Sequence, residues 1–177
     1  MYSSRDLIII ALSAAFWSVL NVTFAPIFWQ MTHLPFFCDL LAMISLILGI
    51  WWVRKIGTAT LIGITATVIN FIFRPMAFHF LGFTVASIVF DMLAFVVGYN
   101  RVFNKKLGSL ILIVLSVVSA WVAGLIIGSF FMGGRVSVLF FSLLHSIGGL
   151  IGSVLGVMLI KGLEARGVRS VSVTGAS

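Results

Sequence analysis

Long apolar runs alternate with short polar breaks along the whole chain. The runs span residues 7–25, 37–53, 57–73, 80–99, 108–131 and 137–160. Each has roughly 17 to 24 residues, which at about 1.5 Å per residue lets a helix cross a hydrocarbon core of about 30 Å. The runs lack the alternation with a period of two that a membrane β-barrel requires. The pattern therefore predicts an all-α membrane protein, a bundle of six transmembrane helices.

Composition excludes a soluble globular domain. Hydrophobic residues make up 62% of the 177 residues and charged residues only 8%, whereas soluble domains have about 25% charged residues. We expect one transmembrane domain, residues 1–160, and a short polar tail, residues 161–177. The first apolar run is longer than the roughly 7 to 15 residues of a signal-peptide core, so we interpret it as a membrane span.

The distribution of charge predicts an orientation. Nine of the eleven lysines and arginines lie near the N-terminus, in the breaks after the second and fourth runs, and after residue 160. With six spans these segments share one side, which the positive-inside rule assigns to the cytoplasm, so both termini are expected there, in a cell membrane. Arg74 and Arg135 fall on the other side. Contact with anionic lipid accounts for the net charge of +7, and no nucleic-acid partner is expected.

The breaks on the predicted outer side differ from the basic ones. Residues 26–37 contain two prolines and several aromatic residues, so we expect a folded loop or lid there. Trp29 in this segment either contacts a ligand or belongs to an interfacial aromatic belt. Arg74 lies in the next outer break, and Gly133 and Gly134 in the last one are candidate hinges.

Polar residues inside the spans predict a path that descends from the outer surface. At about 1.5 Å per residue, Asp91, Trp121 and His145 lie about 16, 15 and 12 Å below the outer ends of their spans. Three further polar side chains lie within one or two turns of that surface: Asn21, Asn70 and Asp39. A charged residue near a helix centre costs about 2.5–3.5 kcal/mol on insertion scales and usually faces the bundle interior.

Each of these residues also has a structural interpretation. In that interpretation Asp91 is protonated, or paired with Ser87 or His145 so that it only locks helices together, and Trp121 fills the bundle core. Taken together, however, an acid, an imidazole and an indole at one depth predict a pocket for a small, partly cationic aromatic molecule. Asp91 would pair with its cationic group, Trp121 would stack on it, and His145 and Asn70 would supply hydrogen bonds. A thiamine-like or pyrimidine-like molecule ranks first, although Arg74 at the rim would suit an anionic group.

Catalytic motifs are absent from the sequence. It contains no H-E-x-x-H or G-x-S-x-G pattern and only one cysteine, Cys38. Its three histidines, His33, His79 and His145, are too far apart in the sequence to predict a metal site. We therefore expect no enzyme, no metal and no cofactor.

The first span contains the stretch ALSAA, which places Ala11 and Ala15 on one helix face in the predicted cytoplasmic half. With six short spans and cytoplasmic termini, the chain resembles the S components, the substrate-capture subunits of energy-coupling factor vitamin transporters. The resemblance implies that the alanine face docks on a transmembrane coupling subunit that works with two ATPase subunits. It also implies that a vitamin is captured from outside, under the outer loops. The chain has no G-x-x-x-x-G-K-[ST] phosphate loop of its own.

A second class of function stays open. An ion- or proton-coupled secondary transporter would use Asp91 and His145 as a relay. The sequence shows no internal repeat and no pair of broken helices, which such transporters usually have. This weighs against the second class, and we expect capture of a small molecule.

Overall fold

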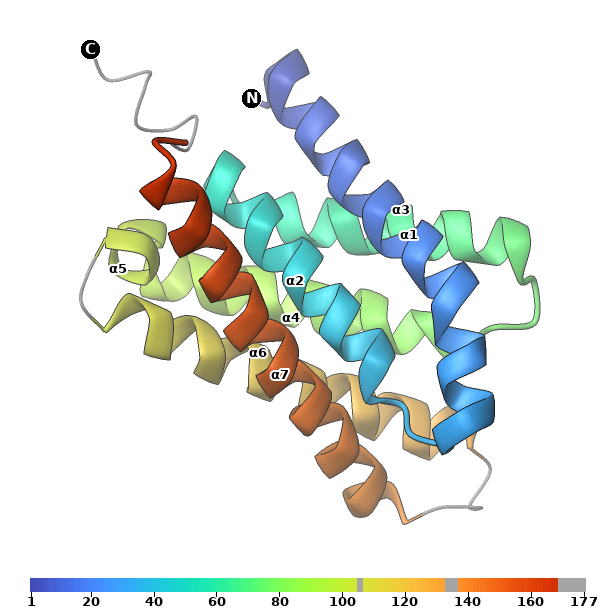
Figure 1. Cartoon of the computed structure of the whole chain (residues 1–177). Helices are drawn as coiled ribbons and strands as arrows, with labels where there is room; N and C mark the ends of the chain where they lie inside the picture. Colours follow the sequence, from blue (N-terminus) through green and yellow to red (C-terminus); the bar gives the residue numbers. More distant parts are fainter. Residues whose placement is uncertain (105–106, 133–136, 169–177) are drawn as a thin grey trace.

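The computed structural model describes residues 1–104, 107–132 and 137–168, and these ranges are almost entirely helical, with no strand. The helices are α1 (Ser4–Thr32), α2 (Phe36–Val53), α3 (Thr58–Phe73), α4 (Phe80–Val97), α5 (Tyr99–Asn104), α6 (Gly108–Ile126) and α7 (Val138–Ala165), and a π-helical turn, η1 (Ile127–Phe131), continues α6 (Figure 1). Five of the helices are long and apolar enough to cross a membrane: α1, α2, α4, α6 together with η1, and α7. The remaining predicted span, α3, is apolar but has only 16 residues.

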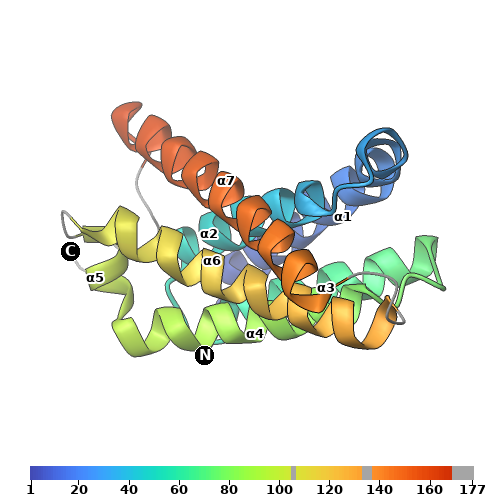
Figure 2. The ribbon, with the colours of Figure 1, turned by 90° about the horizontal axis from the view of Figure 1, so that it is seen from below.

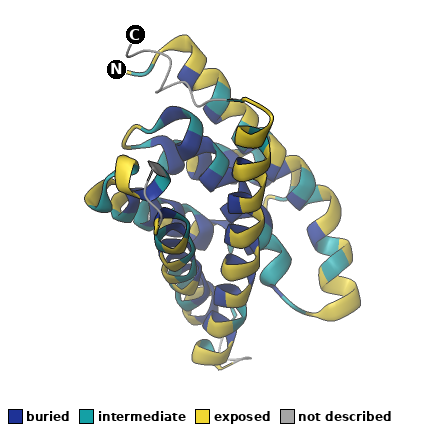
Figure 3. Ribbon diagram, turned by 60° about the vertical axis from the view of Figure 1, so that its left-hand side comes forward, coloured by how far each residue is buried: buried dark blue, intermediate teal, exposed yellow. Residues whose placement is uncertain are grey.

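The six longer helices close a ring. In order around it, α1 packs on α3, α3 on α4, α4 on α6, α6 on α7, α7 on α2, and α2 on α1. Seen from below, α4, α6 and α7 follow one another across the bundle (Figure 2). Buried residues face the middle of the ring, whereas exposed residues cover the outer faces of the helices (Figure 3). Many of the exposed residues are large and apolar, as contact with lipid requires.

The bundle has two distinct ends (Figure 1). The N-terminal end holds the start of α1, the turn between α2 and α3, α5 and the last turns of α7. The cavity end, named for the site described below, holds the α1–α2 connection and the turn between α3 and α4. Successive long helices run in opposite directions between these ends, as the alternation of apolar runs and polar breaks predicts.

The largest departure from the sequence prediction is at the end of α1. Residues 26–37 were expected to form a loop or lid, but α1 continues through Pro26 to Thr32 and only residues 33–35 connect it to α2. A proline removes one backbone hydrogen bond, here to the carbonyl of Val22, and apolar helices of membrane proteins tolerate this loss. The predicted loop is therefore wrong, and this segment forms a helical wall instead.

Glycines allow α2 and α7 to approach each other closely. A Cβ atom on Gly148 would lie 2.5 Å from the carbonyl oxygen of Phe36, and one on Gly152 would lie 2.6 Å from that of Leu40. Only glycine leaves room for the α2 backbone at these positions. The close approach brings the first turns of α2 against the middle of α7.

Two sequence predictions concern residues outside the described ranges. The candidate hinges Gly133 and Gly134 lie there, together with Arg135. Most of the predicted tail, from residue 169 onward, lies there too. Its first residues belong to α7, which extends to Ala165 rather than ending at residue 160.

Candidate ligand-binding site

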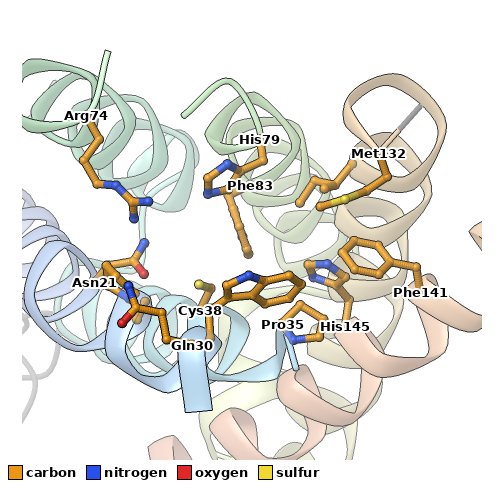
Figure 4. A pocket seen from close by; sticks show the side chains of 14 residues that line it. Asn21, Gln30, Pro35, Cys38, Arg74, His79, Phe83, Met132, Phe141 and His145 are labelled. Atoms are coloured by element: carbon orange, nitrogen blue, oxygen red, sulfur yellow. The ribbon is translucent and has the colours of Figure 1, made fainter. Parts of the chain in front are cut away.

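A cavity of about 320 Å³ lies at the cavity end of the bundle (Figure 4). Side chains from α1, α2, α4, η1, α7 and the turn between α3 and α4 line it. Six separate parts of the chain thus converge on one space. Its volume is at the lower end of the range of small-molecule sites.

An acid and an imidazole meet at this cavity. His145 of α7 lines it, and its Nδ1 lies 2.7 Å from Oδ2 of Asp39 on α2. The two side chains are 2% and 0% exposed. The two atoms are at ion-pair distance. Asp39 Oδ1 and His145 Nε2 have no partner among the described residues.

Further buried polar atoms lack partners near this pair. Asn21 lines the cavity, is 1% exposed, and neither its Oδ1 nor its Nδ2 forms a hydrogen bond with the described residues. Asn70 donates from Nδ2 to the carbonyl of Ala66, but its Oδ1 has no partner, and neither has Nε1 of Trp17. A buried polar group without a hydrogen bond costs about 1–3 kcal/mol. Of these groups, Asn21 lines the cavity, where the polar atoms of a ligand would supply its missing hydrogen bonds.

Aromatic rings surround the imidazole. The ring centroids of Phe141 and Phe83 lie 4.7 and 5.8 Å from that of His145, and both phenylalanines line the cavity. Trp17 contacts Phe83 edge to face at 6.0 Å. Trp29 lines the α1 side and is 40% exposed. Such walls suit a planar ring.

Charge in the cavity is unevenly distributed. Arg74, half-buried in the turn after α3, lines it and forms no ion pair with any carboxylate of the described residues. Burial lowers the pKa of His79 from 6.5 to about 4, and the nearby charges of Arg74 and His145 lower it too. His79 is thus neutral at neutral pH. Figure 4 shows the Arg74 side chain extending toward Asn21, with His145 on the other side of the cavity next to Phe141.

Five of the seven predicted site residues lie at this end of the bundle. Trp29, Arg74 and His145 line the cavity, and Asp39 contacts His145. Asn70 is fully buried one turn before Arg74, and its backbone carbonyl accepts a hydrogen bond from the Arg74 N–H. It does not line the cavity. Asp39 was expected near the rim, yet it is the carboxylate that meets the imidazole.

Asp91 lies elsewhere, and its predicted place at the floor of the pocket is corrected. Its Oδ2 accepts a hydrogen bond from the backbone N–H of Thr60 at 3.0 Å, and the Tyr99 hydroxyl donates to its Oδ1 at 3.4 Å. Thr60 is in the first turn of α3, where N–H groups have no acceptor within the helix, and Gly57 at the N-cap offers no side chain. Asp91 on α4 therefore caps α3 at the N-terminal end of the bundle.

Trp121 is also separate from the cavity. It is 43% exposed and belongs to the outer surface of α6. Counting residues along a helix gives the depth of a side chain but not the direction in which it points. Trp121 therefore cannot stack on a molecule bound in this cavity, in contrast to the sequence prediction.

Sequence reasoning did not single out several cavity residues as binding residues. Trp17, Asn21, Ala25 and Trp29 follow one another at intervals of four along one face of α1, which is the face that meets the cavity or its surroundings. That spacing was the signal that could have identified Asn21. Phe141 similarly precedes His145 by one turn on α7.

No metal site is apparent in the described part of the chain, which contains no group of three or more His, Cys, Asp or Glu side chains able to hold an ion. His33 and His79 lie near the cavity end, but they do not gather around His145 as metal ligands.

The predicted docking residues lie on the outside of α1. Ala11 is exposed and Ala15 partly buried, both in the half of α1 nearer the N-terminal end. A shallow apolar groove of about 310 Å³ runs beside them between α1 and α2, lined among others by Leu12, Phe16 and Trp52. Only 28% of the apolar stretch of α1 is buried, against 44% to 67% for the other four long helices. This helix has the most surface free to meet lipid or a partner.

Comparison with known proteins yields no match, either to a protein-family model, to a curated protein or to a solved structure. The interpretation of the site therefore depends on its own geometry and chemistry.

Proposed function

We propose that the chain is a membrane-embedded binding subunit that captures a small water-soluble vitamin or precursor for uptake driven by ATP-hydrolysing partners. The observation that supports this most is the set of buried polar atoms without partners around an aromatic cavity. Leaving Asn21, Asp39 and His145 unsatisfied destabilises the empty protein. A bound molecule with matching donors and acceptors would remove that cost.

The chemistry of the cavity favours a pyrimidine-like molecule. A planar heterocycle can lie against the aromatic lining of Phe83, Phe141 and Trp29, and its ring nitrogens and substituents can pair with Asn21 and His145. A thiamine-like cation is less favoured than the sequence suggested. Its expected counter-ion, Asp91, caps α3 at the other end of the bundle.

Orientation follows from charge in this proposal. The basic segments cluster at the N-terminal end, so the positive-inside rule places that end in the cytoplasm and the cavity end outside. The exposed alanine face of α1 would then dock a transmembrane coupling subunit, which two ATPase subunits drive. The resemblance to S components of energy-coupling factor transporters supplies this arrangement.

The rival proposal of a proton relay between Asp91 and His145 has less support. Asp91 bonds to Thr60 and Tyr99, whereas His145 contacts Asp39. No contact joins the two groups among the described residues. Capture therefore remains the proposed function.

Thermal-shift measurements on purified protein test the proposal directly. The panel comprises vitamins and their heterocyclic precursors, each added at increasing concentration. At least one compound is expected to raise the melting temperature, because a ligand that binds only the folded state stabilises it. If no compound does so, the proposal fails.

Substitution of Asn21 locates the binding site. Asn21→Ala should weaken binding of the active compound about tenfold or more, since each lost buried hydrogen bond is worth about 1–2 kcal/mol. Asn100→Ala, an equivalent change at an exposed position of α5, is the matched control and should leave affinity unchanged. Equal affinity of both variants would place the ligand elsewhere.

Bulky residues on α1 test the docking surface. Ala11→Trp combined with Ala15→Trp should preserve ligand binding but abolish uptake in cells that contain the coupling complex. Leu155→Trp with Leu159→Trp, an equally spaced exposed pair on α7, is the control. Normal uptake by the α1 variant would exclude this face as the docking site.

A further inference from the structure

Arg74 has no counter-ion in the cavity that it lines. Asp6 pairs with Lys55, and Asp39 contacts His145. Neither reaches the Arg74 guanidinium. A half-buried cation beside an apolar bundle is unfavourable unless an anion accompanies it. The planar fork of a guanidinium matches carboxylate and phosphate groups, which it binds with two parallel hydrogen bonds.

The side chains nearest to Arg74 add hydrogen-bond donors. Figure 4 shows Arg74 extending toward Asn21, whose amide nitrogen has no acceptor among the described residues. His79, on the same side of the cavity, is neutral at neutral pH because its pKa is lowered to about 4, so it does not duplicate the charge of Arg74. This side of the cavity thus offers one permanent cation and a free amide.

The opposite side has different chemistry. There His145 lies against Phe141 and Phe83, and Nε2 of its imidazole has no hydrogen-bond partner among the described residues. The Asp39 carboxylate lies against the imidazole of His145, at 2.7 Å from its Nδ1. This side therefore suits the face of a planar ring and a ring N–H or amino group.

From this asymmetry we infer that the captured molecule is an acidic heteroaromatic compound, whose carboxylate or phosphate binds Arg74 and Asn21 while its ring lies against Phe83, Phe141 and His145. The inference rests on the proposed capture function and narrows its substrate class. It also reverses the charge expected from the sequence, where a cation was predicted. The phosphate of a lipid headgroup is a second source of the same anionic chemistry at Arg74.

Matched pairs of compounds test the inference. Each pair shares a ring and differs in an acidic group: nicotinate and nicotinamide, orotate and uracil, and 4-amino-5-hydroxymethyl-2-methylpyrimidine with and without its phosphate. Affinities are measured by calorimetry with the full chain in neutral detergent, and again in bilayers with and without anionic lipid. In at least one pair the acidic member should bind tenfold tighter or more in detergent.

Two substitutions assign the preference to Arg74. Arg74→Gln should remove the preference, so that the acidic member binds no more tightly than the neutral member. An unchanged circular-dichroism spectrum and a cooperative thermal transition show that the variant is folded. Arg101→Gln, at an exposed arginine of α5, is the matched control and should retain the preference. Arg74→Lys, which keeps the charge but not the planar fork, should retain the preference at reduced strength.

The outcomes separate the inference from the proposed function. If the neutral members bind as tightly as the acidic ones, the acidic class is excluded while capture stands. The inference also fails if Arg74→Gln retains the full preference. Loss of the preference only in anionic bilayers would show that lipid phosphate competes for Arg74 and would support its anion-binding role. If no compound binds the wild-type protein, capture fails and the inference fails with it.

Discussion

The two ends of the bundle differ in whether their buried polar groups have hydrogen-bond or ion-pair partners. Among the described residues of the N-terminal end, the buried polar side chains have partners: Asp91 accepts from Thr60, Asp6 pairs with Lys55 at 2.6 Å, and Trp51 donates to Glu164 at 3.2 Å. At the cavity end the amides and the acid–imidazole pair keep atoms without partners among the described residues. A buried hydrogen-bond network in which every polar group has a partner stabilises a fold, whereas buried polar groups without partners lower the free energy of unfolding.

Two aspartates make the comparison specific. Asp39 and Asp91 are 0% and 1% exposed, and both lie in apolar helices. Asp91 accepts hydrogen bonds from the Thr60 N–H at the start of α3 and from the Tyr99 hydroxyl of α5. Asp39 contacts one imidazole, and its Oδ1 has no partner among the described residues. The set of partners, rather than burial or charge, distinguishes the structural carboxylate from the one available to a ligand.

The largest expected effect follows from making the cavity end apolar. Asp39→Leu combined with His145→Phe should reduce affinity for the captured compound about 100-fold or more, or about 2.7 kcal/mol. The melting temperature of the ligand-free protein should stay the same or rise, because replacing a buried pair by apolar residues is often neutral or stabilising by about 1–4 kcal/mol. Calorimetry and thermal unfolding measure both quantities. A strong loss of stability with intact affinity would make this pair structural.

The same type of change at the other end should have the reverse effect. Asp91→Leu leaves the Thr60 N–H and the Tyr99 hydroxyl without their acceptor, so stability should fall by about 1–3 kcal/mol. Ligand affinity should be unchanged, because Asp91 does not line the cavity. Thermal unfolding and calorimetry on this variant check the prediction. A tenfold loss of affinity without loss of stability would return Asp91 to the binding site.

Glycine substitutions compare the two ends of α7. Gly148→Ala would place a Cβ atom 2.5 Å from the Phe36 carbonyl, so α2 must shift at the cavity end. We expect a loss of about 1–3 kcal/mol in stability, typical of overpacking, and weaker ligand binding. Gly162→Ala meets nothing within 4 Å and should be neutral or slightly stabilising. Similar melting temperatures for the two variants would contradict the close approach of α2 and α7.

The smallest effect concerns pH. Since the pKa of His79 is about 4 in the folded protein and near 6.5 when unfolded, the unfolded state binds more protons between these values. Stability should therefore be fully present above pH 6.5 and decline as the pH falls toward 4. His79→Gln should reduce this decline, while its melting temperature relative to wild type stays constant above pH 7. Parallel declines in both proteins would assign the pH dependence to other groups.

The sequence predicted the helices better than the site. Most of the predicted runs match observed helices to within one or two residues at their starts, because long apolar runs have few alternatives to helix in a membrane. The main failure was at Pro26, where a strong local signal for a break was overridden by the apolar helix around it. The sequence also gave no indication of α5.

For the site, residue types were more predictable than positions. Asn21, Asn70 and Asp39 were predicted near the outer ends of their spans, Arg74 in an outer break and His145 deeper, and these residues do lie at the cavity end. Depth along each helix placed Asp91 and Trp121 beside them, but packing between helices decides which residues meet. The glycines of α7 allow α2 to approach closely, and this approach brings Asp39 to His145. Counting residues along one helix cannot predict it.

The π-helical turn η1 has a consequence for the evolution of this protein. A π turn holds one residue more than an α turn, and each residue added to a helix rotates everything after it by about 100°. Ile127 lies in this turn and Met132 follows it, and both line the cavity. Gain or loss of a single residue here would turn a different side chain toward the cavity. The lining of the cavity can thus change through a one-codon insertion or deletion, without any change elsewhere in the bundle.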